Sequence, residues 1–359
     1  MSATWCVIYL CCLAVAGYPV VAGLARGRSR WETLGLSLCM GPGFVAICLI
    51  FVSMLGFRPS RVEILVLTGL CVLAGALVCR RGCGENIAVN GGRVFWLWGI
   101  ICALAIGYGI SALVIDTVHY PVIEWDAFAI WQLKAEVLTH LPLHPRPGYF
   151  SDVNLSYSHL RYPLLVPMMS AGAHAMSGRM DDLCKTVALL LYPGMLAAVF
   201  AAVRRINGAS AGLTAVALLA CLQPMLLYGG SGTAEMALTA FYACSLLCVL
   251  RWRENGRWGD LALCALFSAW MTWTKNEGLA LAAANAVVLA GIRVRGSRRN
   301  ALNGAAVFVG IVAAIYLPWV VFSWGLPRTD EDYAGNLGIR AVVANVGRLP
   351  QIVWAIVVE

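Results

Sequence analysis

Two carboxylates stand two residues apart in Glu124-Trp125-Asp126, just after a long apolar run of the sequence. An ionised carboxylate such as Asp126 can act as a general base that removes the proton of a hydroxyl group. Glu124 can position the acceptor or share a divalent metal, Mg²⁺ or Mn²⁺, with Asp126. Asp is also a favoured helix N-cap, and capping the segment that follows explains Asp126 equally well. The sequence leaves both interpretations open.

A second cluster, Tyr157-Ser158-His159-Leu160-Arg161-Tyr162-Pro163, combines basic and aromatic residues. Arg161 can bind an anionic headgroup through parallel N–H donors, and His159 can add to it. An arginine beside apolar sequence also commonly extends toward phospholipid phosphates without binding a substrate. His159 and Arg161 are therefore candidates for binding a lipid phosphate, with ordinary membrane anchoring as the alternative.

Two further candidates flank the apolar runs nearer the C-terminus. Lys275 lies in Thr274-Lys275-Asn276-Glu277-Gly278, between two apolar runs, where it can pair with Glu277 or face a lipid phosphate. Glu235 ends Gly-Gly-Ser-Gly-Thr-Ala-Glu and opens an apolar run, so it can cap a helix or bind a substrate. We predict that Lys275 and Glu235 take part in substrate binding.

The elements that position these residues are membrane spans. Of 359 residues, 60% are hydrophobic and 12% charged, against roughly half and about a quarter in soluble domains. This composition excludes an ordinary soluble protein and predicts an all-α polytopic membrane protein with about 10–11 transmembrane helices. The apolar runs fall at 3–25, 34–56, 62–79, 94–115, 183–203, 210–228, 236–250, 260–274, 278–292 and 301–323.

The arginines predict the orientation of these spans. They gather in short segments at 26–30, 80–93, 204–205, 251–257 and 293–299, which the positive-inside bias places in the cytoplasm. The net charge of +8 is therefore an orientation signal, and we expect no nucleic-acid partner. This topology holds only if the short apolar stretch 163–178 does not cross the membrane, so we predict an interfacial or re-entrant helix there.

The same topology leaves one long outer segment, residues 116–182. Within it, 127–139 has an apolar face and predicts an amphipathic helix along the bilayer surface. Tryptophans at 96–98, 270–273 and 319–324 predict a belt of anchors at the membrane interfaces.

These features together resemble the polyprenyl-phosphate-sugar-dependent glycosyltransferases of the GT-C fold, the group that includes protein mannosyltransferases and aminoarabinose transferases. The resemblance lies in the order of the motifs over about residues 94–350. Glu124-Trp125-Asp126-Ala127 resembles the acidic motif of the family's first outer loop, followed by juxtamembrane helices and Arg161-Tyr162-Pro163. Lys275 to Gly278 resembles a later outward turn, and Glu235 stands where many relatives have an aspartate.

The resemblance implies a hexosyl- or pentosyltransferase of the bacterial cytoplasmic (inner) membrane, with its active side facing the periplasm or exterior. It would move a sugar from a polyprenyl phosphate donor to a lipid, glycan or protein acceptor, in contact with membrane lipids and with inversion at the anomeric carbon. The cofactor that the motifs could hold is a divalent metal, Mg²⁺ or Mn²⁺, and the sequence identifies no other. The alternatives are a non-enzymatic membrane protein, such as a lipid-linked glycan flippase or a small-solute transporter, and an inactive truncated family member.

The resemblance also predicts a division of the chain. Residues 1–93 would form three additional N-terminal transmembrane helices, and 94–359 the GT-C-like core with its outer catalytic loop at 116–182. Because relatives continue through more spans where this sequence stops, we expect a C-terminally short core.

Overall fold

The computed structural model describes residues 2–24, 27–79, 96–178, 185–292, 294 and 297–327, together with 343, 346–348, 350, 351 and 354. Within these residues the chain is helical, and its only β-type pairing is an isolated bridge between Val294 and Ser297. Six helices are long and apolar enough to cross a membrane. The predicted all-α polytopic membrane fold is confirmed.

The long helices coincide with the ten predicted apolar runs. Six of these ten helices meet the criteria of length and composition for a membrane span, and the other four, α3, α8, α11 and α12, do not. The helices in this set of ten are α1 (Ser2–Leu24), α2 (Arg30–Met54), α3 (Arg61–Cys79), α4 (Trp96–His119), α7 (Ala188–Asn207), α8 (Ala209–Ala220), α10 (Glu235–Asn255), α11 (Trp258–Thr274), α12 (Glu277–Gly291) and α13 (Arg298–Ser323).

Shorter elements occupy the long predicted outer segment, of which residues 179–182 lie outside the described part. In chain order they are a π-helix (Ala127–Gln132), α5 (Leu133–His140), two 3₁₀ turns (Gly148–Ser151 and Val153–Ser158) and α6 (Leu165–Ser177). A further short helix, α9 (Gln223–Tyr228), follows α8. The predicted amphipathic helix at 127–139 therefore forms, as a π-helix that continues into α5.

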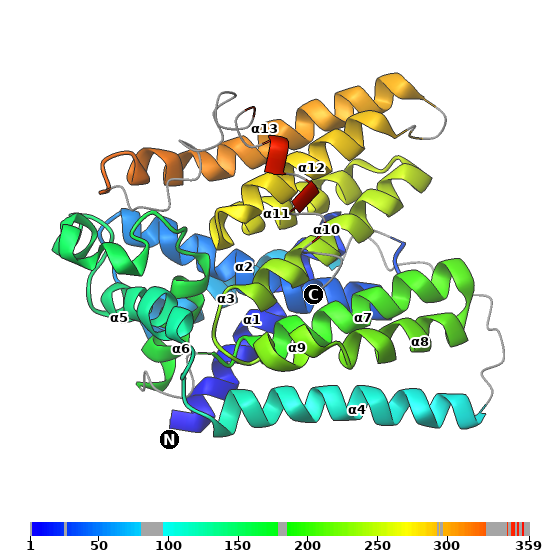
Figure 1. Cartoon of the computed structure of the whole chain (residues 1–359), viewed down its shortest axis with the longest axis horizontal. Coiled ribbons are helices and arrows are strands. Elements are labelled where there is room, and N and C mark those ends of the chain that lie inside the picture. Colours follow the sequence, from blue (N-terminus) through cyan, green and yellow to red (C-terminus); the bar gives the residue numbers. More distant parts are fainter. Residues whose placement is uncertain are drawn as a thin grey trace.

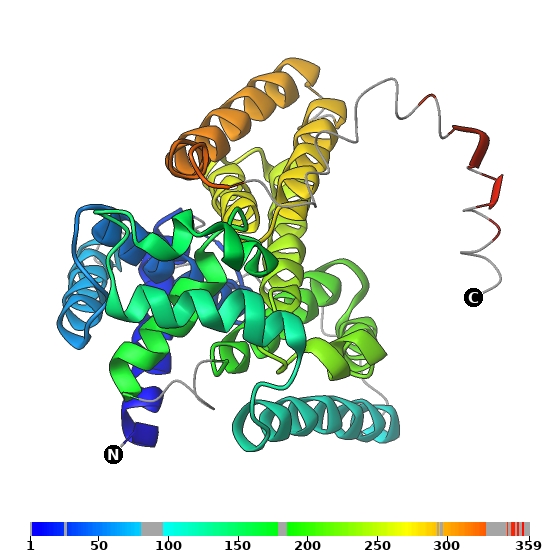
Figure 2. The ribbon, with the colours of Figure 1, turned by 60° about the vertical axis from the view of Figure 1, so that its left-hand side comes forward.

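The helices give the bundle two distinct ends (Figure 1). At one end, α5 and α6 gather; we call it the loop end. Contacts there include the bond from Leu143 N–H to the Ser53 carbonyl (3.1 Å) and from Arg146 Nη2 to the Phe322 carbonyl (2.8 Å). The opposite end, where α7 turns into α8 and α10 into α11, carries the arginines that end those helices, among them Arg204, Arg205, Arg251 and Arg253, and is called the arginine end. Figure 2 shows α4 and α13 at opposite edges of the bundle.

Helix α6 begins and ends at the loop end. Before it, Arg161 bonds the carbonyl of Leu326, just past the loop end of α13. After it, the Met176 carbonyl accepts from Arg61 Nε at the loop end of α3 (2.9 Å). A helix of 13 residues is about 20 Å long, too short for a bilayer core, so this geometry agrees with the predicted non-crossing helix.

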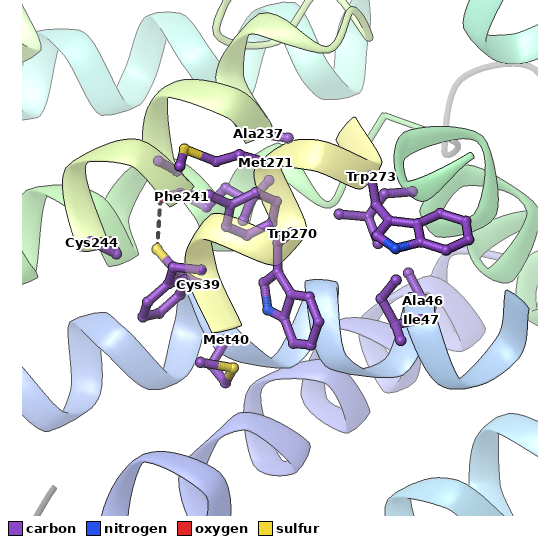
Figure 3. Close-up of a cluster of buried hydrophobic side chains, with 14 of the residues drawn as sticks. Cys39, Met40, Ala46, Ile47, Ala237, Phe241, Cys244, Trp270, Met271 and Trp273 are labelled. Carbon is purple, nitrogen blue, oxygen red and sulfur yellow. Dashed lines mark hydrogen bonds between the residues drawn. The ribbon is translucent and has the colours of Figure 1, made fainter. Parts of the chain in front are cut away.

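The centre of the bundle packs tightly because small residues allow backbones to approach. A Cβ on Gly17 of α1 would lie 2.0 Å from the Ser37 carbonyl oxygen of α2, and one on Gly41 would lie 1.8 Å from that of Leu13. Such close helix contacts are typical of membrane bundles. Figure 3 shows the neighbouring core, where side chains of α2, α10 and α11 interlock, among them Met40, Phe241 and Trp270.

The predicted tryptophan belt is wrong for three of its members. Trp270, Trp273 and Trp319 are almost fully buried, and Trp273 Nε1 donates to the Ile315 carbonyl at 2.9 Å. Trp96 and Trp324 are instead exposed, as expected of interfacial anchors. Trp270 and Trp273 of α11 pack against α2, and Trp319 of α13 packs against Trp273. Position in the sequence does not distinguish these buried tryptophans from the exposed ones.

A closed network of buried charges ties the helices together at the arginine end. Arg28 bonds Glu32 and Asp260, each at 2.5 Å, and Arg251 bonds Glu32 at 2.9 Å. Asn255 donates to the second oxygen of Asp260 (2.6 Å). Two arginines face two carboxylates, so the charges balance where burial makes an unpaired charge costly.

Candidate active site at the loop end

The two carboxylates of the first motif lie on the surface at the loop end. Glu124 and Asp126 are exposed, and within the described residues neither side chain has a hydrogen-bond or ion-pair partner. Asp126 has helical backbone angles (φ −61°, ψ −41°) and makes no capping bond. The N-cap interpretation is therefore wrong, because Asp126 lies inside the first turn of the helix.

The helix that follows Asp126 has the wide π geometry, which is rare and often occurs at functional sites. Aromatic contacts attach it to the second motif: Trp125 lies 6.4 Å from Tyr157, and Trp131 lies 5.6 Å from Tyr162, between ring centroids. The structure thus brings the acidic motif and the His159–Tyr162 segment together, although the side chains of Asp126 and Arg161 do not bond each other.

A buried lysine holds this junction. Lys134 is fully buried, and its Nζ donates to the His159 carbonyl at 2.6 Å beside the rings of Trp131 and Tyr162. Burial lowers the pKa of Lys134 well below its usual value of 10.5, since a dry surrounding disfavours the charged form. Sequence reasoning missed this lysine because its position within an amphipathic helix resembles that of any solvated residue.

Two residues of the second motif, His159 and Arg161, make contacts within the fold. His159 has a left-handed backbone (φ 51°) and stacks on Tyr162 with 4.8 Å between ring centroids. Arg161 donates from Nε and Nη2 to the Leu326 carbonyl, at 3.1 and 2.7 Å. Two of its five N–H donors are thus occupied by a backbone oxygen, and three remain for a ligand.

The third motif forms a separate charge cluster. Lys275 Nζ lies 3.0 Å from Glu235 Oε1 and 3.3 Å from Glu277 Oε1. The pairing of Lys275 with Glu277 that the sequence suggested is confirmed, and Glu235 joins it from the start of α10. Burial lowers the pKa of Lys275, but the two carboxylates outweigh it and raise the pKa above 10.5.

A glycine-rich turn, Gly229 to Ala234, connects the clusters. Gln132, at the end of the π-helix, donates to the Gly232 carbonyl at 3.3 Å, and this turn leads directly into Glu235. Lys185 approaches from the other side, with its Nζ 2.6 Å from the Asp116 carbonyl oxygen. Sequence reasoning missed Gln132, Lys185 and Asp116; the only signal was a lone lysine before an apolar run.

The candidate residues therefore form two groups. Glu124 and Asp126 lie with the segment of His159 and Arg161, while Glu235 and Lys275 lie beyond the glycine turn. Within the described residues, no group of three or more His, Cys, Asp or Glu side chains could hold a metal ion.

Comparison with known proteins points to one family. The family model of the dolichyl-phosphate-mannose-protein mannosyltransferases matches residues 161–324. This range contains Arg161, Glu235 and Lys275, and it begins after Glu124, Asp126 and His159. Searches of curated proteins and of solved structures gave no match. The predicted resemblance is confirmed over residues 161–324, and it supports a membrane glycosyltransferase of the GT-C type.

Proposed function

We propose that the chain transfers a sugar from a polyprenyl phosphate donor to an acceptor hydroxyl at the loop end of the bundle. The loop end would face the periplasm or exterior, because the arginine segments at the other end favour the cytoplasm. The sugar would be a hexose or a pentose. The family match over residues 161–324 supports the reaction class.

Asp126 is the proposed general base. Its carboxylate removes the proton of the acceptor hydroxyl while the oxygen attacks the anomeric carbon of the donor sugar. The bond between that carbon and the phosphate oxygen breaks, the bonding electrons leave with the polyprenyl phosphate, and the configuration inverts. Glu124 positions the acceptor beside Asp126.

Positive charge on the leaving phosphate is the second requirement, since charge develops there in the transition state. Lys275 and Arg161 are the proposed partners of the phosphate, with His159 beside Arg161. Glu235 holds Lys275 in place at 3.0 Å and lies within reach of the same substrate.

One observation carries the proposal: Asp126 is an exposed carboxylate with no partner in the described part of the chain, on a π-helix packed against the motif that opens the family match. Buried polar groups are normally hydrogen-bonded within the fold, whereas the Asp126 carboxylate makes no such bond in the described chain. An exposed carboxylate without a partner remains available as a base.

The test is a transfer assay on the full chain in detergent. Radiolabelled polyprenyl phosphate sugars, each bearing one hexose or pentose, are mixed with a membrane extract as acceptor source, and we expect label to leave the lipid. Asp126→Asn and heat-inactivated protein serve as controls. Label that stays on the lipid but crosses the bilayer of proteoliposomes would contradict the proposal and indicate a flippase.

A further inference from the structure

A small pocket of about 40 Å³ opens beside the glycine turn. This volume has room for roughly three water molecules, so it suits one compact chemical group and excludes a prenyl chain. Its walls are mostly apolar, from Val166, Met169, Leu191 and Met236. Its polar lining includes Lys185 and Thr233. None of the residues assigned above to substrate binding lines it.

Three helices present their amino-terminal parts to this pocket. Its lining includes Val166, the second residue of α6, Ala188, the first of α7, and Met236, the second of α10. The amino-terminal end of a helix carries partial positive charge and favours anions. Three such ends around one pocket make it more positive than its mostly apolar walls suggest.

Lys185 supplies a full positive charge at the same place. The residue is 4% exposed, and within the described chain its Nζ donates one hydrogen bond, to the Asp116 carbonyl at 2.6 Å. The Asp116 carboxylate lies 3.7 Å away, beyond hydrogen-bond distance. An ammonium group has three donors, so Lys185 keeps donors for a further ligand.

The two cations assigned above to phosphate binding, Lys275 and Arg161, are more fully used. Lys275 faces two carboxylates, which leaves that cluster with a net charge of −1. Arg161 uses Nε and Nη2 on the Leu326 carbonyl. Lys185 faces one carboxylate, at a longer distance, and it lines this pocket, which Lys275 and Arg161 do not.

We propose that this pocket binds the phosphate group of a phosphate monoester or diester, with Lys185 as its principal ligand and Asp116 as a counter-charge that the phosphate partly displaces. The inference rests on the proposed function and revises one part of it, since Lys185 replaces Lys275 as the principal partner of the donor phosphate. The attached lipid chain, for which the pocket is too small, then extends out of it.

The test measures dissociation constants of the full chain in nanodiscs for farnesyl phosphate, farnesol and inorganic phosphate. Lys185→Met should weaken farnesyl phosphate binding by about 10- to 100-fold, the effect of losing a hydrogen bond to a charged group. Lys185→Arg should keep binding within about threefold. Asp116→Asn should tighten it severalfold, because it removes the competing negative charge and keeps the backbone carbonyl. Farnesol binding should not respond to any of these changes.

Arg205→Gln, at the arginine end, is the matched control for removal of a positive charge and should leave every constant unchanged. Displacement of farnesyl phosphate by inorganic phosphate, in the wild type and not in Lys185→Met, would support the same site with free phosphate as its source. If Lys185→Met and Asp116→Asn both weaken farnesyl phosphate and farnesol alike, the two residues are a structural ion pair and the inference is overturned. Equal binding of farnesyl phosphate and farnesol by the wild type would also overturn it.

The transfer assay separates this inference from the proposed function. Sugar transfer by the wild type, together with an unchanged farnesyl phosphate constant in Lys185→Met, would overturn the Lys185 site and leave the proposed function standing. Opposite effects of Lys185→Met and Asp116→Asn without any sugar transfer would support the phosphate site and contradict the glycosyl transfer.

Discussion

The two ends of the bundle use charged residues in opposite ways. At the arginine end, Arg28, Arg251, Glu32 and Asp260 are buried to a large extent and satisfy one another. At the loop end, Glu124 and Asp126 are exposed, and within the described residues nothing pairs with them. The sequence makes both sets look like charges flanking apolar runs, yet only one set is available to a substrate.

The difference shows how to separate structural from functional charge in a membrane protein. Removing one member of a closed, buried network leaves an uncompensated charge, so its cost appears in stability. Removing an exposed carboxylate without partners costs the fold little, so its effect appears in activity. Each prediction below changes one charge and asks which of the two quantities responds.

The largest expected effect is on activity at the loop end. Asp126→Asn should reduce the rate of sugar transfer by 100-fold or more, the usual contribution of a general base. The midpoint of thermal denaturation should stay within the error of the wild-type value, since no contact is lost. Normal transfer by a folded Asp126→Asn variant would remove Asp126 from the catalytic role.

The next effect is on stability at the arginine end. Arg28→Met should lower the free energy of unfolding by about 3–5 kcal/mol, because within the described residues it leaves Asp260 without a cation and Glu32 with Arg251 alone. Thermal denaturation in detergent measures the loss. The rate of sugar transfer below the denaturation range should remain near that of the wild type. A variant as stable as the wild type would mean that the network contributes nothing to the fold.

Lys134 lies at the loop end but is buried. It therefore tests whether burial or location decides if a charged residue affects stability. Its pKa is lowered in the folded state, so the unfolded state binds the proton more tightly. Stability should therefore rise with pH between the lowered pKa and about 10.5, by up to about 1.4 kcal/mol per pH unit. Below that window the penalty is fully present, and above it the penalty is gone.

Denaturation midpoints of the wild type and Lys134→Met across this pH range provide the measurement. Lys134→Met should remove the rise, because its side chain does not titrate. Parallel curves for the two proteins would show that Lys134 keeps its proton in the folded state.

The smallest effect belongs to a partly exposed pair at the arginine end. Arg205 bonds Glu254, with 21% and 44% of the two side chains exposed. Arg205→Gln should change the free energy of unfolding by less than about 1 kcal/mol, as for other surface ion pairs. A loss as large as that from Arg28→Met would mean that location, and not burial, decides the cost.

Much of the fold could be predicted from local patterns. Apolar runs long enough for a bilayer predict helices wherever they occur, because no other element satisfies the backbone there. The prediction that 163–178 does not cross the membrane, with which the geometry of α6 agrees, came from its short length and the positions of the arginines. The tryptophans of α11 could not be assigned in the same way, since whether Trp270 faces lipid or Met40 depends on which helix packs beside it.

The candidate site, too, has features that the local sequence predicts and features that depend on tertiary contacts. The sequence by itself determined the helical membrane fold, the opposite placement of arginines and acidic motifs, and the identity of Asp126, Arg161 and Lys275 as candidates, because these depend on composition and order along the chain. Only the tertiary structure decided that Asp126 caps nothing, that Lys275 is shared by two carboxylates, and that Lys185 meets Asp116 across 69 positions of sequence. Such pairings join residues far apart in the chain, and the sequence around a residue does not indicate which distant residue its side chain will contact.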